Sequence, residues 1–215
     1  MAEGYIIIDK ATTYINENAK IGKGTVIKPN TTIEGTAVIG ENSVIGPNSV
    51  ICGGIIGDNV TVLMSYVNDA SVGCGTTVGP FAHLRPGTVL GENCKIGNFV
   101  EIKNSGIGNG TKISHLTYIG DSDVGENVNF GCGTVTVNYD GVKKSRTTVA
   151  DGAFIGCNTN LVAPVTVGKN AYTAAGSTIT ADVPAGALGL SRVKQTNIDG
   201  WADKKFPKKD KGKNG

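Results

Sequence analysis

Large apolar residues recur at every sixth position along most of this chain. The first unbroken run consists of Ile21, Ile27, Ile33, Ile39, Ile45 and Ile51, and small residues stand two places before its members at Thr25, Thr31, Ala37, Ser43 and Ser49. A period of six fits neither an amphipathic helix nor an isolated hairpin, and it is typical of a parallel β-helix. We expect the large residue to fill the interior and the small one to fit where the chain turns a corner. The pattern therefore predicts an all-β hexapeptide-repeat solenoid.

The interruptions of this repeat locate one protruding loop. The period slips by one at Ile107 and at Val124, and thirteen residues separate Thr136 from Val149, which is one hexad plus seven residues. The extra segment contains Asn-Tyr-Asp-Gly at 138–141 and the basic residues Lys143, Lys144 and Arg146. Because long loops on repeat scaffolds are common binding sites, we expect this loop to take part in function.

Composition favours one stacked domain followed by an irregular tail. The chain has 32 Gly among 215 residues and only 6% aromatic residues, which argues against a wide globular core. Stability must then come from the stacking of each coil on its neighbours. The repeat is lost beyond Pro184, and lysines crowd the last dozen residues. We therefore predict a β-helix domain over residues 1–200 and a Lys-rich, disordered tail over residues 201–215.

Charge and cysteine content indicate the compartment and the partners. The formal net charge of +2 gives no reason to expect nucleic acid as a partner. The five cysteines are odd in number and contain no C-x-x-C pair, which favours a reducing compartment. Residues 5–8 are too short for a signal-peptide core, and no apolar stretch is long enough to span a membrane. We expect a cytoplasmic protein that binds neither nucleic acid nor membrane.

Two cations are predicted to stack on adjacent coils. If three hexads form one coil, residues 18 apart are neighbours on one face, separated by roughly 4.8 Å. Arg85 and Lys103 have this spacing, and Tyr118 belongs to the same edge one coil further on. Like charges at this distance repel each other unless an anion such as phosphate lies between them. The alternative is two solvated side chains that diverge into water.

One histidine lies close to this edge. His115 and Tyr118 share a short segment, and Asn129 is expected on the neighbouring coil of the same edge as His115. A histidine that faces outward from a rigid wall can act as a general base near neutral pH, although most lone histidines do not. His83 directly precedes an apolar repeat position, so we expect a structural role for it.

A third set of residues suggests a surface for an extended ligand. Cys157 and Ala175 are also 18 apart, and small side chains surround both. Such residues leave backbone groups open to a ligand that runs parallel to the axis, although they serve ordinary corner packing equally well. Arg192 follows Ala175 at nearly the same spacing, where a cation could meet the end of that ligand.

Several unusual segments resemble a known family. They are GPFAHLRPG at 79–87, GNFVEIK at 97–103, HLTYIGD at 115–121, VNYDG at 137–141 and LVAPVTVG at 161–168. Together they resemble the C-terminal acetyltransferase domain of the bacterial bifunctional enzymes that make UDP-N-acetylglucosamine. The resemblance covers nearly the whole chain. It implies a left-handed β-helix, a homotrimer with shared active sites, and acetyl transfer from acetyl-CoA to the amine of glucosamine 1-phosphate.

The resemblance also implies roles for individual residues. Its general base would be His115, and Glu101 would orient that histidine. The residues implied for the sugar phosphate are Arg85, Lys103, Tyr118, Asn129 and Lys144. Those implied for acetyl-CoA are Cys132, Asn138, Tyr139, Cys157, Ala175 and Arg192. We expect direct transfer, because the predicted arrangement places no histidine near either cysteine to activate it as a nucleophile.

Other enzyme and non-enzyme classes remain to be weighed. A zinc site of three histidines is excluded, because the chain has only His83 and His115 and a symmetric trimer offers one copy of each per site. Acetyl transfer through a histidine base needs no metal. Residues 1–20 contain no Gly-rich nucleotide loop, so we expect no uridylyl transfer. The alternatives are an acyltransferase for another amino sugar or small amine, and a non-catalytic scaffold.

Overall fold

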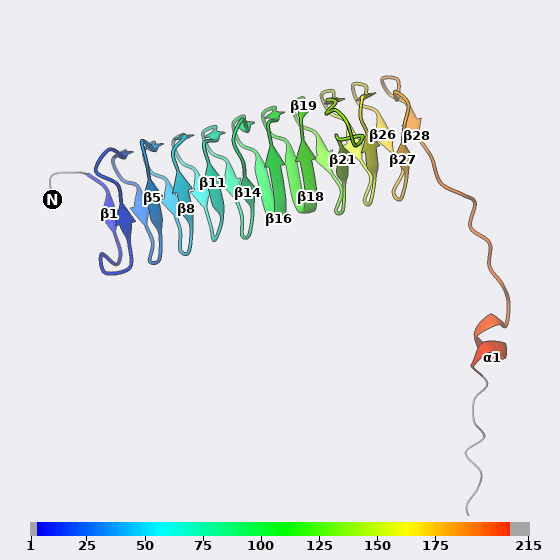
Figure 1. Ribbon diagram of the computed structural model, residues 1–215, viewed down its shortest axis with the longest axis horizontal. Helices are drawn as coiled ribbons and strands as arrows, with labels where there is room; N and C mark the ends of the chain where they lie inside the picture. The colour runs from blue at the N-terminus through cyan, green and yellow to red at the C-terminus, as the bar shows by residue number, and fades with distance from the viewer. Residues whose placement is uncertain (1–3, 207–215) are drawn as a thin grey trace, which may run out of the picture.

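The computed structural model describes residues 4–206 and shows a prism of stacked coils (Figure 1). Every ladder between named strands is parallel, and most coils contribute one short strand to each of three faces. The first described residues lie at one end of the prism, and an extended segment leaves the other end (Figure 1). The predicted parallel β-helix is therefore confirmed.

Two of the three faces are joined into one sheet of 19 strands. Face 1 contains β1 (Ile6–Ile7), β4 (Val26–Ile27), β7 (Val44–Ile45), β10 (Thr61–Val62), β13 (Thr77–Val78), β20 (Asn129–Phe130), β23 (Phe154–Ile155), β26 (Tyr172–Thr173) and β28 (Leu188–Gly189). Face 2 contains β2 (Tyr14–Ile15), β5 (Thr32–Glu34), β8 (Val50–Cys52), β11 (Tyr66–Asn68), β14 (His83–Leu84), β21 (Val135–Val137), β24 (Asn160–Val162) and β27 (Thr178–Ile179). The long strands β16 (Lys95–Lys103) and β18 (Lys112–Gly120) run through the corner and belong to both faces.

Face 3 is a separate sheet of nine strands. It contains β3 (Lys20–Ile21), β6 (Val38–Ile39), β9 (Ile55–Ile56), β12 (Ser71–Val72), β15 (Val89–Leu90), β17 (Gly106–Ile107), β19 (Ser122–Val124), β22 (Thr147–Val149) and β25 (Val165–Val167).

The repeat residues form the interior as the pattern predicts. Ile27 and Ile45 are fully buried on face 1, and the small residues Thr25 and Ser43 before them are buried as well. The Thr25 hydroxyl donates to the Gly40 carbonyl at 2.7 Å and accepts from the Ser43 amide at 3.0 Å. A hydroxyl at the inner corner therefore satisfies backbone groups that an apolar side chain would leave unpaired.

Glycines after the repeat residue allow the coils to approach each other. A Cβ on Gly22 would lie 2.5 Å from the carbonyl carbon of Gly40 on the next coil. Such a contact is far shorter than van der Waals distance, so a side chain at this position would push the coils apart. Gly22 is therefore needed because it has no side chain to clash with the neighbouring coil.

The register between coils is not constant. Val26 pairs with Val44 at a sequence spacing of 18, whereas Glu101 pairs with Tyr118 at a spacing of 17. From β20 to β23 the spacing is 25, because the protruding loop lies between these strands. These shifts decide which side chains share an edge.

The predicted loop is present between β21 and β22. It contains an antiparallel bridge between Tyr139 and Lys144. One carboxylate oxygen of Asp140 accepts hydrogen bonds from the amides of Val142 and Lys143, both at 2.8 Å. The loop is therefore a small ordered turn.

The end of the chain differs from the prediction. The last coil ends at β28, and residues 190–200 have no regular secondary structure and are exposed. A short helix, α1 (Trp201–Lys205), then follows where we expected disorder from residue 201 on. Lys204 and Lys205 occupy its last turn, where positive charge is favourable. Residues 207–215 of the predicted tail lie outside the described residues. Within residues 4–206, no helix is long and apolar enough to cross a membrane.

Candidate active site

The predicted site residues gather at two different corners of the prism. The loop corner, between faces 2 and 3, contains Arg85, Lys103, Asp121, Asn138 and Lys144. The histidine corner, between faces 1 and 2, contains Asn98, His115, Cys132, Cys157 and Ala175. Both corners lie on the long strands β16 and β18, which carry Asn98, Lys103 and His115 directly.

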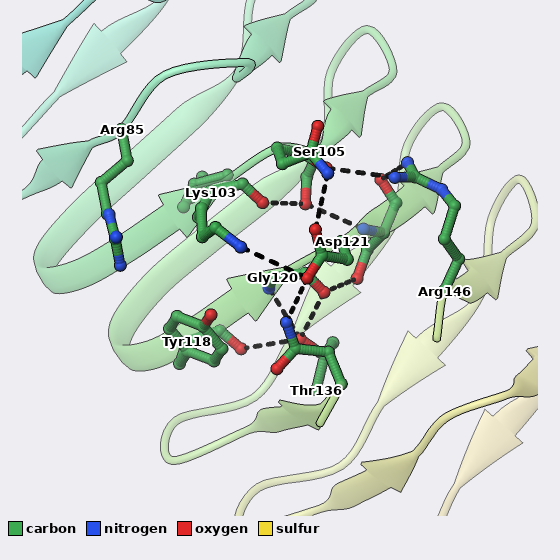
Figure 2. A network of polar contacts seen from close by, with 12 residues as sticks. Arg85, Lys103, Ser105, Tyr118, Gly120, Asp121, Thr136 and Arg146 are labelled. Carbon is green, nitrogen blue, oxygen red and sulfur yellow. Dashed lines mark hydrogen bonds and ion pairs between the residues drawn. The ribbon is translucent and has the colours of Figure 1, made fainter. Parts of the chain in front are cut away.

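A buried carboxylate organises the loop corner (Figure 2). Asp121 has only 6% of its side chain exposed, and its Oδ2 pairs with Lys103 Nζ at 3.4 Å. Asn104 Nδ2 donates to Asp121 Oδ1 at 2.6 Å, and Asn138 Nδ2 donates to Oδ2. Burial alone would raise the pKa of Asp121, but these hydrogen bonds and the Lys103 charge outweigh burial and lower it. Asp121 therefore stays ionised and ties the start of the loop to the cation edge.

The cations at this corner exceed their local counter-ions. Arg85 Nη1 pairs with Glu101 Oε1 at 2.8 Å, and Lys103 pairs with Asp121. Lys144 approaches from the loop, and the proximity of Lys103 lowers the pKa of Lys144 because the two ammonium groups repel each other. In this pair Lys103 keeps its proton more firmly: the neighbouring Lys144, which yields its own proton more readily, and then the charge of Asp121 raise the pKa of Lys103. An anion bound between these cations would relieve the repulsion.

Tyr118 lies against the same corner. Figure 2 shows its ring beside Gly120, below Lys103. A Cβ on Gly120 would collide with the Tyr118 hydroxyl, so glycine is needed for the ring to take this position. The predicted stacking of Arg85 on Lys103 is confirmed by the register, whereas on the next coil Gly120 is opposite Lys103 and Tyr118 is opposite Glu101.

An arginine fixes the other end of the loop. Arg146 Nε and Nη2 both bind the Asp123 carboxylate, at 2.8 and 2.5 Å, and Nη2 also donates to the Ser122 carbonyl at 3.0 Å. The bidentate bond to Arg146 lowers the pKa of Asp123. The loop is therefore held at both ends by carboxylates that lie close together in the chain.

At the histidine corner, Asn98 orients His115. The two residues are in register on β16 and β18, and Asn98 Oδ1 lies 2.6 Å from His115 Nδ1. Since an amide oxygen only accepts, Nδ1 carries the proton and Nε2 presents its lone pair. The imidazole is exposed. This is the arrangement that a general base requires.

The expected partner of this histidine was wrong. Glu101 is in register with Tyr118 and not with His115, and its carboxylate binds Arg85. The spacing of 17 between β16 and β18 brings Asn98 opposite His115 instead. Asn98 and Asp121 were both missed, although the slip at Ile107 was a signal that a spacing of 17 should be searched on these coils.

One column of residues runs up the histidine corner. Register pairs on both sides place Cys132 beside His115, Cys157 beside Cys132 and Ala175 beside Cys157. The expectation that neither cysteine has a histidine nearby is therefore wrong for Cys132. The His115 ring, however, binds Asn98 on the preceding coil, on the side away from Cys132.

An apolar edge begins at the same corner. Phe81, Phe99 and Leu116 occupy successive coils, each more than half exposed and each with positive φ. Bulky residues rarely adopt this conformation, but the same turn also has positive φ on earlier coils at Asn48 and Met64, so it belongs to the way the chain turns this corner. The phenyl rings of Phe81 and Phe99 stack with centroids 5.4 Å apart. They border an open depression of about 420 Å³ that also reaches Glu101 and Tyr118.

The remaining predicted residues lie apart from these contacts. Asn129 is on face 1, one coil beyond Lys112, and Tyr139 is in the loop, where its hydroxyl donates to the Gly141 carbonyl at 2.7 Å. Arg192 is exposed in the segment beyond β28. The rings of His83 and Tyr66 lie with centroids 4.9 Å apart and are tilted by 31°, and His83 also borders the open depression, so its structural role stays a prediction.

Comparisons with known proteins point to one family. A family model described as bacterial transferase hexapeptide (six repeats) matches residues 69–104 and 146–181, and one described as hexapeptide repeat of succinyl-transferase matches residues 36–64. Bifunctional protein GlmU of Caldicellulosiruptor saccharolyticus is 58% identical over 201 residues, which are 94% of this chain and 43% of that protein. Bifunctional protein GlmU of Clostridium perfringens is 59% identical over 202 residues, which are 94% of this chain and 44% of that protein. The chain thus spans less than half the length of these curated relatives.

Solved structures agree on the fold. UDP-N-acetylglucosamine acyltransferase of Francisella novicida superposes with a TM-score of 0.60 at 20% identity, over 86% of this chain and 66% of that one. UDP-N-acetylglucosamine acyltransferase of Campylobacter jejuni superposes with a TM-score of 0.59 at 20% identity, over 91% of this chain and 76% of that one.

Proposed function

This chain belongs to the hexapeptide-repeat transferases related to the bifunctional protein GlmU, and we propose that it acetylates the amine of glucosamine 1-phosphate with acetyl-CoA. The product would be N-acetylglucosamine 1-phosphate, a precursor for UDP-N-acetylglucosamine. The observation that carries this proposal is His115, oriented by Asn98 on β16 and β18, the strands that also carry the cation edge.

His115 supplies the base that the reaction needs. An amino sugar is largely protonated in water and must lose a proton before it can attack a carbonyl carbon. The first proton leaves the ammonium group to solvent. Nε2 of His115 then accepts a second proton from the attacking amine while the new C–N bond forms and the C–S bond breaks, and His115 passes that proton to the departing thiolate. Acetyl-CoA contributes the activated thioester. Polar groups of the loop stabilise the charge that develops on the carbonyl oxygen.

The loop corner supplies the acceptor site. Arg85, Lys103 and Lys144 converge there with two carboxylates between them, so a phosphate would find unbalanced positive charge. Tyr118 and Asn129 complete the sugar pocket in this proposal. At the histidine corner, the column of Cys132, Cys157 and Ala175 presents short side chains, which suits a narrow pantetheine arm. Asn138, Tyr139 and Arg192 would hold the remainder of acetyl-CoA.

A panel of acceptors tests the reaction. Thiol release from acetyl-CoA should be fast with glucosamine 1-phosphate and slow with glucosamine, galactosamine 1-phosphate and simple amines. EDTA should leave the rate unchanged, because a histidine base needs no Lewis acid. Preference for another amine would favour the alternative acyltransferase, and no transfer to any amine would favour a scaffold.

We also propose a homotrimer whose sites are shared between chains. The two corners lie at opposite edges of face 2, and the five steps along the chain from His115 to Gly120 span at most about 18 Å. The apolar edge of Phe81, Phe99 and Leu116 is exposed on this chain and suits contact with a second copy. One chain's histidine corner would then face its neighbour's loop corner. The free cysteines support a cytoplasmic site of action.

Subunit mixing tests this sharing. His115→Ala removes the base at one corner, and Asn138→Ala disturbs the other. Trimers that combine both kinds of chain include interfaces at which both corners are wild type, so activity should reappear after subunit exchange. No recovery after verified exchange would contradict shared sites.

A further inference from the structure

Two cysteines lie side by side on neighbouring coils of the histidine corner. Cys132 and Cys157 share a sequence spacing of 25 with the flanking register pairs Phe130–Ile155 and Val135–Asn160. The Asn158 amide donates to the Cys132 carbonyl at 2.7 Å, which holds the two turns together. The protruding loop lies between them in the sequence, which hides this pairing from a search at hexapeptide spacing.

The two turns approach each other as closely as neighbouring coils do elsewhere in the prism. A Cβ on Gly131 would lie 2.5 Å from the Cys157 amide nitrogen and 2.8 Å from its Cα. Neighbouring parallel strands place paired Cα atoms roughly 4.8 Å apart, which is inside the range of about 4.4 to 6.8 Å found across disulfides. Both thiols are free, and Cys157 is exposed whereas Cys132 is half-buried. The Cα spacing expected for residues paired on neighbouring coils therefore fits a disulfide.

We propose that Cys132 and Cys157 form a dithiol site that reacts with low-molecular-weight disulfides and closes into an intramolecular disulfide. The exposed Cys157 thiolate attacks one sulfur of the small disulfide and releases one thiolate. The Cys132 thiolate then attacks the Cys157 sulfur and releases the second. The protein loses two protons and two electrons, and the small disulfide becomes two thiols.

The bond would change the surface assigned to the pantetheine arm. It would bridge two of the three short side chains of the column, beside His115, and tie together the coils before and after the loop. This consequence rests on the proposed function, whereas formation of the bond does not. Oxidation should therefore raise the KM for acetyl-CoA, and a dithiol reductant should restore it.

Peptide mapping tests the bond independently of activity. The reduced full chain is incubated with oxidised glutathione, remaining thiols are alkylated, and trypsin is added. Cleavage after Lys112, Lys143, Arg146 and Lys169 places the two cysteines in separate peptides, residues 113–143 and 147–169. We expect these peptides to be linked, with an intact mass lower by two hydrogen atoms.

Single variants distinguish this pathway from random oxidation. In Cys132→Ala the reaction with oxidised glutathione should stop at a glutathione adduct on Cys157. In Cys157→Ser, Cys132 should remain largely unmodified. Cys52 is an internal control, because its register partners on the neighbouring coils are Glu34 and Asn68 and neither is a cysteine. Stable glutathione adducts on wild type without linked peptides, or equal modification of Cys52, would overturn the dithiol site. If the peptides are linked but the KM for acetyl-CoA is unchanged, only the proposed effect of the disulfide on acetyl-CoA binding is overturned.

Discussion

Replacing Asp121 with Asn should destabilise the protein strongly, although the two side chains have nearly the same shape. Asp121 is 6% exposed and accepts from Asn104, Asn138 and Lys103. The new amide NH₂ must face one of these donors, so at least one charge-assisted hydrogen bond, worth about 1.5 to 3 kcal/mol, is lost and a buried donor is left unpaired. We expect the free energy of unfolding to fall by about 2 to 4 kcal/mol.

Asp123→Asn is the matched control. Asp123 stands two residues away and also binds a cation, but 60% of its side chain is exposed. An exposed ion pair of this kind contributes about 0 to 1 kcal/mol. The same chemical change should therefore have a much smaller effect at Asp123 than at Asp121.

Urea unfolding at one fixed protein concentration measures both changes. With a slope of about 2 kcal/mol per molar urea, the midpoint of Asp121→Asn should fall by about 1 to 2 M. The pKa of Asp121 is lowered in the folded protein, so its stabilisation is complete above the ordinary value near about 3.9 and is lost as the pH falls through the lower folded-state value. The difference in the free energy of unfolding between wild type and Asp121→Asn should therefore become smaller below about pH 4. Equal midpoints for the two variants would refute the assigned role of Asp121.

Further substitutions at three places test the candidate site. Arg85→Ala and Lys103→Ala should each raise the KM for glucosamine 1-phosphate far more than the KM for acetyl-CoA. In a double-mutant cycle on KM the two effects should be non-additive. Equal losses with unphosphorylated glucosamine as the substrate would contradict a phosphate site. Asn98→Ala should lower kcat by about one to two orders of magnitude and shift the acidic limb of the pH–rate profile, with partial rescue by Asn98→Asp, because Asn98 positions the base. Gly120→Ala should displace the Tyr118 ring and raise the KM for the sugar, whereas Gly106→Ala, where a Cβ meets nothing within 4 Å, should not.

The fold could be predicted from the sequence because one repeat governs nearly every coil. A buried isoleucine such as Ile27 and a buried threonine such as Thr25 recur with the same spacing, so the sequence of each coil independently predicts the same structure. The helix α1 could not be predicted in this way, because it lies beyond the last coil and has no repeat.

The site could be predicted only where the spacing stays regular. Arg85 and Lys103 are 18 apart and were placed correctly on one edge. Asn98 and His115 are 17 apart, so a search at 18 passed over their contact, and the family resemblance named Glu101 instead. The pairing of Cys132 with Cys157 was hidden further, because the loop inserts seven residues between their coils. Local register, which depends on how each turn is built, decides these contacts.

The central claim is that His115 removes the proton from glucosamine 1-phosphate as the acetyl group moves to its amine. The most direct measurement compares thiol release by wild type and His115→Ala at saturating acetyl-CoA and glucosamine 1-phosphate, with the product identified by mass. The account predicts that turnover falls by a factor of roughly 10² or more while affinity for acetyl-CoA and the thermal melt remain nearly unchanged. Near-normal turnover by the variant at saturating substrates would contradict it.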